Sequence, residues 1–219
     1  MGEALRLYHG SKSGIEGPIS PIGSSVNDFG RGFYLGDEPS QPLTLICRGE
    51  KPTFYTCELD LAGLKVHRFD DGLDWALFVA WNRDMIPEEF RSAYDERFQA
   101  LRGANDVLVG RIANDRVFQA VQFFFKRIIT IETLCEVLNA LNLGRQYCAI
   151  SRKACQNIKI LSERDVGPTE RDNLRLKSDM QRKRADELTE KIIDSRRRTD
   201  GLFFDEICEK YASGEGLPI

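Results

Sequence analysis

The segment LYHGS at residues 7–11 is followed, after a loop rich in Gly, Ser and Pro, by NDFGRGFYLGD at residues 27–37. The first segment places His9, one of only two histidines, at the end of a short predicted strand. In the second, Gly30 and Gly32 flank an arginine. Glycines at this density let a backbone approach a ligand closely, because no β-carbon stands in the way. A histidine before a glycine is by itself more typical of a core residue, so the pair of segments is what predicts a binding site.

The composition is typical of a soluble globular protein with a hydrophobic core. Hydrophobic residues make up 42% and charged residues 30% of the 219 residues. The net charge of −3 provides no excess of cations for general binding to nucleic acids or membrane surfaces. The six cysteines form no Cys-x-x-Cys pair, which favours reduced structural cysteines over a metal site. With no visible signal peptide and no run long enough to span a bilayer, we expect a cytoplasmic protein that contacts no membrane.

The spacing of the apolar residues predicts strands and helices in a mixed order. Short strands are expected at the two opening segments and at TFYTCELDL, DVLVGRI and QYCAIS. Between residues 73 and 143 the pattern is mainly helical. From residue 163 the sequence is dense in charges of both signs, which predicts a long, largely solvated helix. The final apolar segment, GLFFDEICEKY, is expected to pack back on the body.

Taken in order, LYHGS and FGRGFYLG resemble the nicotinamide-binding core of the diphtheria-toxin-like ADP-ribosyltransferases, which include the poly(ADP-ribose) polymerases. Those enzymes carry His-Gly-Ser/Thr at a strand end and a Gly-x-Gly-[IFV]-Tyr-[FL] pattern on the next strand. The chain is also similar to a bacterial family of ADP-ribosyltransferase-like domains of unknown function, often encoded near small antitoxin-like genes. That similarity continues through DWALFVAWNRD, NDVLVGRIANDRV and RQYCAISRKACQNIKIL and so covers residues 5–161.

The resemblance implies that the first strand and Tyr34 bind NAD⁺. His9 would form hydrogen bonds with ribose hydroxyls, and the backbone of Gly10 would pair with the nicotinamide carboxamide. Ser11 would support that pairing. Tyr34 would stack on the nicotinamide ring, a contact that stabilises binding by about 0.5–1.5 kcal/mol beyond area burial.

The glycine-flanked segment would complete the cofactor site. Gly30 and Gly32 would bring the backbone close to NAD⁺. Arg31 either meets the diphosphate, for which its planar guanidinium is suited, or points into solvent. Asn27 and Asp28 are predicted to turn the chain rather than to contact a ligand.

Gln146, at the head of QYCAIS, occupies the third catalytic position, next to His9 and Tyr34 in the implied set. Transferases of this kind commonly hold the ribose 2′-hydroxyl with a glutamate there. Hydrogen bonds to ionised groups are about twice as strong as neutral ones. A glutamine is therefore expected to weaken stabilisation of the oxocarbenium-like transition state by a few kcal/mol.

Three interpretations of Gln146 stay open. The acceptor needs little activation, another acid supplies the charge, or catalysis is lost and the domain only binds a nucleotide. By resemblance, Asp115 and Asp106 are the candidate acids, and we include Asp115 in the cofactor site. An acid at a helix N-terminus, favoured by the helix dipole, is the more common explanation of such a residue as Asp115.

The implied architecture is an α+β ADP-ribosyltransferase-like fold: two small antiparallel sheets packed around an NAD cleft, with a helical insertion at 73–143. The transferase domain would span residues 1–162, and residues 163–219 would form a charged helical extension packed on it. The expected function is NAD-dependent mono-ADP-ribosylation of an intracellular protein or nucleic acid by a bacterial toxin or effector. NAD⁺ would be the co-substrate, without a metal, and an antitoxin is a further expected partner. The alternatives are a catalytically silent NAD⁺- or ADP-ribose-binding module and an NAD⁺ glycohydrolase.

Overall fold

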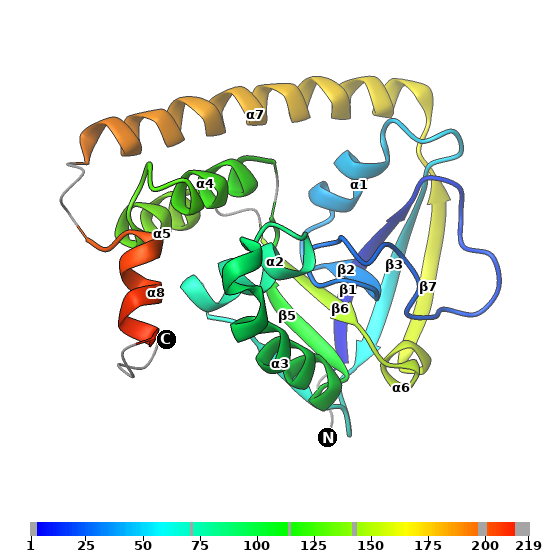
Figure 1. Cartoon of the computed structure of the whole chain (residues 1–219). Coiled ribbons are helices and arrows are strands. Elements are labelled where there is room, and N and C mark those ends of the chain that lie inside the picture. The colour runs from blue at the N-terminus through cyan, green and yellow to red at the C-terminus, as the bar shows by residue number, and fades with distance from the viewer. Residues whose placement is uncertain (1–3, 71, 114, 142–143, 197–200, 213–219) are drawn as a thin grey trace.

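A single sheet of seven strands, in the order β4-β5-β6-β2-β1-β3-β7, forms the centre of the computed structural model (Figure 1). The structure describes residues 4–70, 72–113, 115–141, 144–196 and 201–212. In chain order the described elements are β1 (Ala4–Ser11), β2 (Phe33–Gly36), α1 (Ser40–Ile46), β3 (Thr53–Asp60), β4 (Val66–Arg68), α2 (Leu73–Asn82), α3 (Glu88–Ala104), β5 (Val107–Arg111), α4 (Asp115–Phe125), α5 (Ile131–Ala140), β6 (Arg145–Ala149), α6 (Arg152–Gln156), β7 (Ile158–Asp165), α7 (Pro168–Ser195) and α8 (Phe204–Ala212).

The sheet consists of two halves that meet at one residue pair, which corrects the prediction of two separate antiparallel sheets. Every residue of β1 pairs with β3, but β1 pairs with β2 only through Tyr8 and Gly36. The β4–β5 pairing is parallel, whereas all the others are antiparallel. Apolar side chains of both halves pack together in one cluster. Its buried members are Leu7, Phe33, Leu35, Tyr55, Cys57, Leu59, Val107, Val109, Tyr147, Ala149, Ala154, Cys155 and Ile158.

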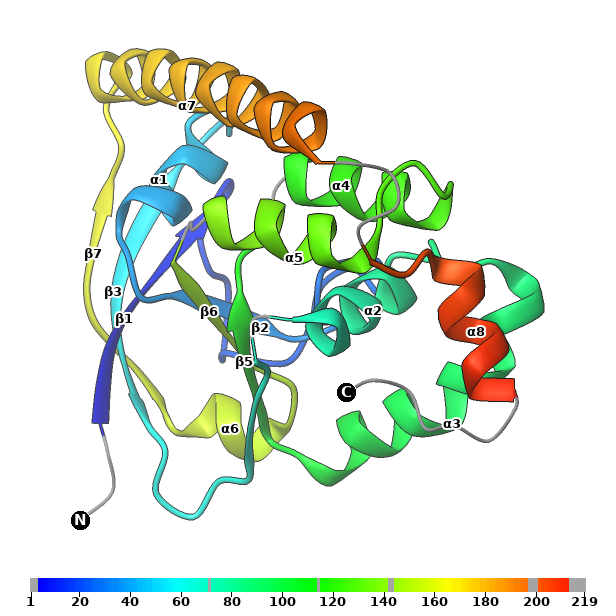
Figure 2. The same ribbon diagram turned by 90° about the vertical axis from the view of Figure 1, so that its left-hand side faces the viewer.

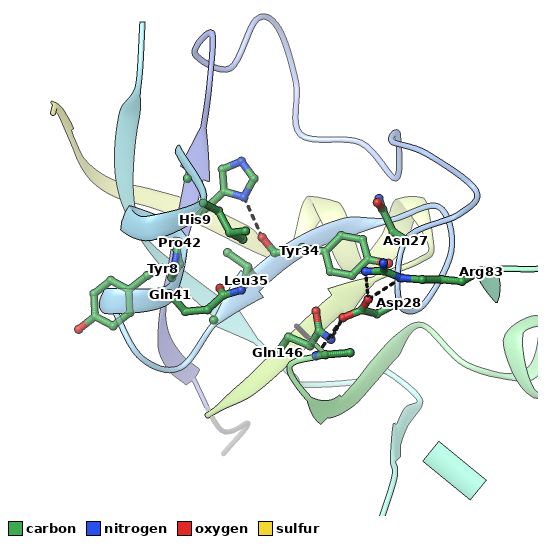
Figure 3. Close-up of a pocket in the computed structure, with 14 residues that line it drawn as sticks. Tyr8, His9, Asn27, Asp28, Tyr34, Leu35, Gln41, Pro42, Arg83 and Gln146 are labelled. Atoms are coloured by element: carbon green, nitrogen blue, oxygen red, sulfur yellow. Dashed lines mark hydrogen bonds and ion pairs between the residues drawn. The ribbon is translucent and has the colours of Figure 1, made fainter. Parts of the chain in front are cut away.

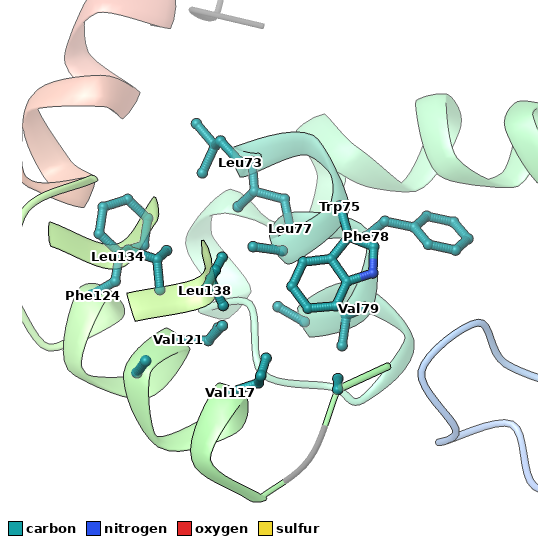
Figure 4. Packing of buried hydrophobic residues seen from close by; sticks show 14 of the residues in the cluster. Leu73, Trp75, Leu77, Phe78, Val79, Val117, Val121, Phe124, Leu134 and Leu138 are labelled. Carbon is teal, nitrogen blue, oxygen red and sulfur yellow. The ribbon is translucent and has the colours of Figure 1, made fainter. Parts of the chain in front are cut away.

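A second and larger core packs helices against the opposite face of β5 and β6. In α2, residues Leu73 and Trp75–Ala80 are all buried, as expected for a helix that is apolar on every side. In α4 the buried side chains recur at Val117, Ala120, Val121 and Phe124, a single helical stripe that faces α2 and α5 (Figure 4). This packing fixes α2, whose C-terminal end reaches the functional site described below.

A strand interrupts the predicted helical insertion at 73–143. It contains α2 to α5, but β5 lies between α3 and α4 and pairs with β4 and β6 in the sheet. The sequence DVLVG is apolar without alternation, which suits a strand buried on both faces. Residues 142–143 lie outside the described ranges.

The charge-rich C-terminal part forms α7, a long helix that runs across α1 at one end and across α4 and α5 at the other (Figures 1 and 2). The strand before it, β7, runs from Ile158 to Asp165 and so crosses the predicted boundary at residue 162. Division of the chain into 1–162 and 163–219 remains a prediction. In the described parts of the chain, no helix combines the length and hydropathy needed to cross a bilayer.

Two arginines of α7 bind the C-terminal end of α1. Arg171 donates from Nε to the carbonyl of Cys47 over 3.1 Å and from Nη2 to the carbonyl of Gly49 over 2.7 Å. Arg175 Nη2 donates to the same Cys47 carbonyl over 3.4 Å. The last carbonyls of a helix have no intrahelical donor and carry partial negative charge. The arginines therefore hold α1 in place.

We expect Arg171→Ala to destabilise the protein and to loosen α1. The substitution removes two hydrogen bonds from a charged donor in a partly buried position, so the free energy of unfolding should fall by about 1–2 kcal/mol. Urea unfolding measures the loss, and faster amide hydrogen exchange in α1 locates it. Lys177→Ala, on the exposed side of the same helix, is the control. An equal loss in both variants contradicts the assigned role of Arg171.

Candidate functional site

A cavity of about 320 Å³ opens where β1 and β2 separate (Figure 3). Small-molecule sites typically occupy about 300–1,000 Å³, so this one is at the small end of that range. The strands β1, β2 and β6, the helix α1, the end of α2 and two loops supply its wall. The lining residues are Tyr8, His9, Gly10, Asn27, Asp28, Tyr34, Leu35, Gly36, Gln41, Pro42, Leu45, Arg83, Ala113 and Gln146. All three residues of the predicted catalytic set belong to this wall.

The imidazole of His9 bridges the gap between the two diverging strands. His9 Nδ1 lies 2.7 Å from the carbonyl oxygen of Tyr34. The imidazole ring stacks on the ring of Phe33, with the two ring centroids 4.3 Å apart. A carbonyl oxygen only accepts hydrogen bonds, so Nδ1 carries the proton in this contact. Burial lowers the pKa of His9 below its ordinary value of 6.5, although the bond to Tyr34 acts in the opposite direction. The ring is therefore neutral, and Nε2 is left as an acceptor.

Comparing the native protein with His9→Ala should reveal a pH-dependent stability contribution. Because the folded-state pKa is lowered, the stabilisation by His9 is fully present above about pH 6.5 and is lost as the pH falls through the folded-state pKa. Urea unfolding from about pH 8 to about pH 5 should show that the native protein is more stable than His9→Ala at high pH. The difference in free energy of unfolding between the two proteins should narrow as the pH falls. A difference that stays constant or widens toward acid contradicts the neutral assignment.

The hydroxyl of Tyr34 fastens the glycine-flanked segment, and its ring lines the cavity. Tyr34 Oη donates to the carbonyl of Gly30 over 2.6 Å and accepts from the amide of Phe29 over 3.0 Å. The ring stacks on Phe29 with centroids 6.5 Å apart. Burial raises the pKa of Tyr34 far above its ordinary value of 10.0, so the phenol stays protonated and keeps both bonds.

Tyr34→Phe should destabilise the protein while keeping the ring in the cavity wall. It leaves the Phe29 amide and the Gly30 carbonyl without their partner, so we expect a loss of about 1–3 kcal/mol in the free energy of unfolding. Chemical denaturation measures it. Tyr8→Phe is the matched control, because the Tyr8 hydroxyl makes no hydrogen bond with any described residue. If both variants lose the same stability, the hydroxyl of Tyr34 does not hold this segment.

Both amide hydrogens of Gln146 are bound by the protein. The side chain is 8% exposed, and Nε2 donates to Asp28 Oδ2 over 2.7 Å and to the Arg111 carbonyl over 2.9 Å. No described residue donates to its carbonyl oxygen, Oε1. Oε1 is consequently the group that Gln146 offers to a ligand, as an acceptor.

Asp28, which was predicted with Asn27 to turn the chain rather than to contact a ligand, lies with Asn27 in the cavity wall. Its carboxylate is almost completely buried and accepts from Arg83 Nη2 over 2.5 Å and from Arg83 Nε over 3.1 Å. It also accepts from the amide of Ala113 over 3.2 Å and from Gln146. The Arg83 guanidinium lies 3.5 Å from the ring centroid of Phe118, a cation–π contact that holds it in place. Sequence reasoning missed Asp28 and Arg83 because 55 residues separate them.

Of the other predicted cofactor residues whose side chains the structure describes, Gly10 lines the cavity, and Ser11, Gly30, Arg31 and Gly32 do not. A β-carbon at Gly10 would come within 2.7 Å of Ile46 and of the Pro42 carbonyl, so close packing on α1 is enough to require this glycine. Ser11 donates to the carbonyl of Gly14 over 2.7 Å. Gly10 and Ser11 stay predictions as ligand-binding residues.

The glycine-flanked arginine segment packs away from this cavity. Arg31 is exposed, and its carbonyl accepts from Arg102 over 3.0 Å. A β-carbon at Gly30 would lie 2.6 Å from Asn82, and one at Gly32 would collide with the thiol of Cys148. Both glycines are thus explained by packing, and a role in binding NAD⁺ remains a prediction for all three residues.

Neither candidate acid is placed beside Gln146 in the described structure. Asp106 lies at the other end of β6, where it accepts from Ser151 over 2.6 Å and from the Lys65 amide over 2.9 Å. These bonds lower its pKa below the ordinary value of 3.8. Asp115 begins α4, but its side chain lies outside the described part of the structure. Within that part, no three His, Cys, Asp or Glu side chains gather in a way that could hold a metal ion.

The comparisons with known proteins identify a family. The sequence matches the family described as "Protein of unknown function (DUF3990)" over residues 5–160. No curated protein matches it significantly. A chain in the crystal structure of the M. tuberculosis MbcT–MbcA toxin–antitoxin complex has 11% sequence identity, with 80% of this chain and 91% of that chain covered at a TM-score of 0.42. So low a TM-score carries no inference about activity, which has to be drawn from the cavity.

Proposed function

The chain belongs to the DUF3990 family of proteins of unknown function, and we propose that it is an NAD⁺-dependent ADP-ribosyltransferase that binds the nicotinamide riboside in the cavity between β1 and β2. One observation carries the proposal. His9, Tyr34 and Gln146 come from three different strands, yet their side chains line the same cavity. Each offers a group that a nicotinamide riboside can use.

The three side chains suit different parts of the substrate. The neutral imidazole of His9 would accept a hydrogen bond from a ribose hydroxyl through Nε2. The ring of Tyr34 would lie against the flat nicotinamide. Gln146 Oε1 would accept from the ribose 2′-hydroxyl, beside the carbon at which positive charge develops. These contacts would orient the scissile bond and stabilise charge in its transition state.

The reaction would proceed by cleavage of the bond between ribose C1′ and the nicotinamide nitrogen. The bonding electrons leave with nicotinamide, which becomes neutral, and the ribose becomes oxocarbenium-like. A nucleophile of the acceptor then bonds to C1′ and loses its proton. The chain supplies orientation and charge stabilisation, and no redox step is needed.

A role as an intracellular toxin or effector, with a macromolecular acceptor and an antitoxin partner, is part of this proposal. Its support is the similarity of LYHGS and FGRGFYLG to ADP-ribosyltransferase-like domains often encoded near antitoxin-like genes. A catalytically silent NAD⁺- or ADP-ribose-binding module is the second candidate. The neutral amide of Gln146 favours it, because an amide stabilises developing positive charge less than a carboxylate does.

Label transfer from NAD⁺ tests the proposal. We expect the native chain, incubated in a bacterial lysate with NAD⁺ labelled on the adenylate, to release nicotinamide and to label a macromolecule. Gln146→Ala should reduce both by roughly 10²–10³-fold, as loss of an electrostatic contact in the transition state does. Gln156→Ala, at the exposed end of α6, is the matched control.

The products distinguish the candidates. Label that is sensitive to protease or to nuclease identifies the acceptor class. Free nicotinamide without macromolecular label identifies water or a small molecule as the acceptor. Bound but intact NAD⁺ with the native chain would contradict transfer and support the binding module.

A further inference from the structure

We propose that Asp28 is a positioning residue for Gln146 and that the two side chains act as one unit. This inference deepens the proposed function and rests on it. It is drawn from the contacts of a buried carboxylate that lines the cavity next to the amide it binds (Figure 3).

The two oxygens of Asp28 have different partners. Oδ1 accepts two hydrogen bonds from Arg83, and Oδ2 accepts from Gln146 Nε2 and from the Ala113 amide. The carboxylate is therefore held from three sides, by α2, by the loop after β5 and by β6. A buried charge with this many donors is fixed in one orientation, so its bond to Gln146 is fixed as well.

That bond determines which end of the Gln146 amide faces a ligand. A carboxylate accepts hydrogen bonds and donates none, so only the NH₂ group of Gln146 can face Asp28. The Arg111 carbonyl takes the second amide hydrogen and enforces the same orientation. A flipped amide would instead point its NH₂ group at the ribose, and the partial positive charge of that group would oppose the positive charge that develops on the sugar.

The bond also changes the charge distribution of the amide. Hydrogen bonds from an N–H group to a carboxylate are short and strong, and they draw electron density from nitrogen toward the carbonyl oxygen. Gln146 Oε1 thereby becomes a better acceptor than an isolated amide oxygen. Arg83 balances the charge of the carboxylate, so Asp28 stays ionised and keeps its bond to Gln146 without leaving a buried charge unpaired.

An exchange of the two side chains tests this unit. Gln146→Glu places two carboxylates in contact, and Asp28→Asn removes the acceptor charge, so each single variant should lower Tm by roughly 5–10 °C. Each should reduce kcat for nicotinamide release by roughly 10–100-fold, with KM within about threefold of native. The double variant Asp28→Asn/Gln146→Glu restores the bond between one amide and one carboxylate, but not the bonds to the Ala113 amide and the Arg111 carbonyl. It should therefore recover only part of the losses, with a Tm and a kcat clearly higher than those expected from adding the two single variants.

Two controls isolate the role of Asp28. Asp74→Asn removes another arginine-bound carboxylate, since Asp74 accepts from Arg97 over 2.7 Å, but it lies outside the cavity wall and should leave kcat unchanged. Asp28→Asn/Arg83→Met removes the uncompensated cation that Asp28→Asn leaves behind, and kcat should stay low. Recovery of kcat in that variant would overturn the proposal, because the loss would then come from the free arginine.

The remaining outcomes separate this inference from the proposed function. If the changes in Tm and kcat of the two single variants simply add up in the double variant, Asp28 and Gln146 do not act as one unit. That result would leave the proposed transfer reaction of the native chain untouched. Native-level kcat in Asp28→Asn would overturn the positioning role even if the Tm values are coupled. A native chain that releases no nicotinamide would overturn the proposed function and the catalytic role of Asp28 together.

Discussion

The separation of β1 from β2 after a single residue pair is the constraint on which the site depends. Tyr8 pairs with Gly36, and beyond that pair β1 bonds only to β3. Past that pair, the imidazole of His9 in β1 bonds to the backbone carbonyl of Tyr34 in β2, where the two strands no longer pair through their backbones. The cavity exists because a side chain replaces backbone pairing at this point, and the same replacement fixes the tautomer of the histidine.

A second constraint is the burial of a charge in the cavity wall. An ionised carboxylate is costly to remove from water unless donors surround it. Asp28 meets this requirement with Arg83, Gln146 and a backbone amide, which come from parts of the chain far apart in sequence. Folding of α2, β5 and β6 against one another is therefore needed before the site is complete, so the stability of the core and the geometry of the site are linked.

The resemblance of LYHGS and FGRGFYLG to transferase motifs selected His9, Tyr34 and Gln146, and all three line the same cavity. Their catalytic roles stay a prediction. The sequence could not give Asp28 its partners, because burial of an acid depends on long-range contacts that local spacing does not encode. The continuity of the sheet was missed for the same reason, since it depends on one pair between Tyr8 and Gly36.

The C-terminal charged segment supports the site from outside, because α7 contacts α1, which forms part of the cavity wall. Pro42 and Leu45 of α1 line the cavity, and α1 is held at its C-terminal end by Arg171. Leu174 packs on the same side of the sheet, against a cluster that contains Ile46. The position of α1, and with it one wall of the cavity, therefore depends on contacts with α7 that its charge-rich composition does not reveal.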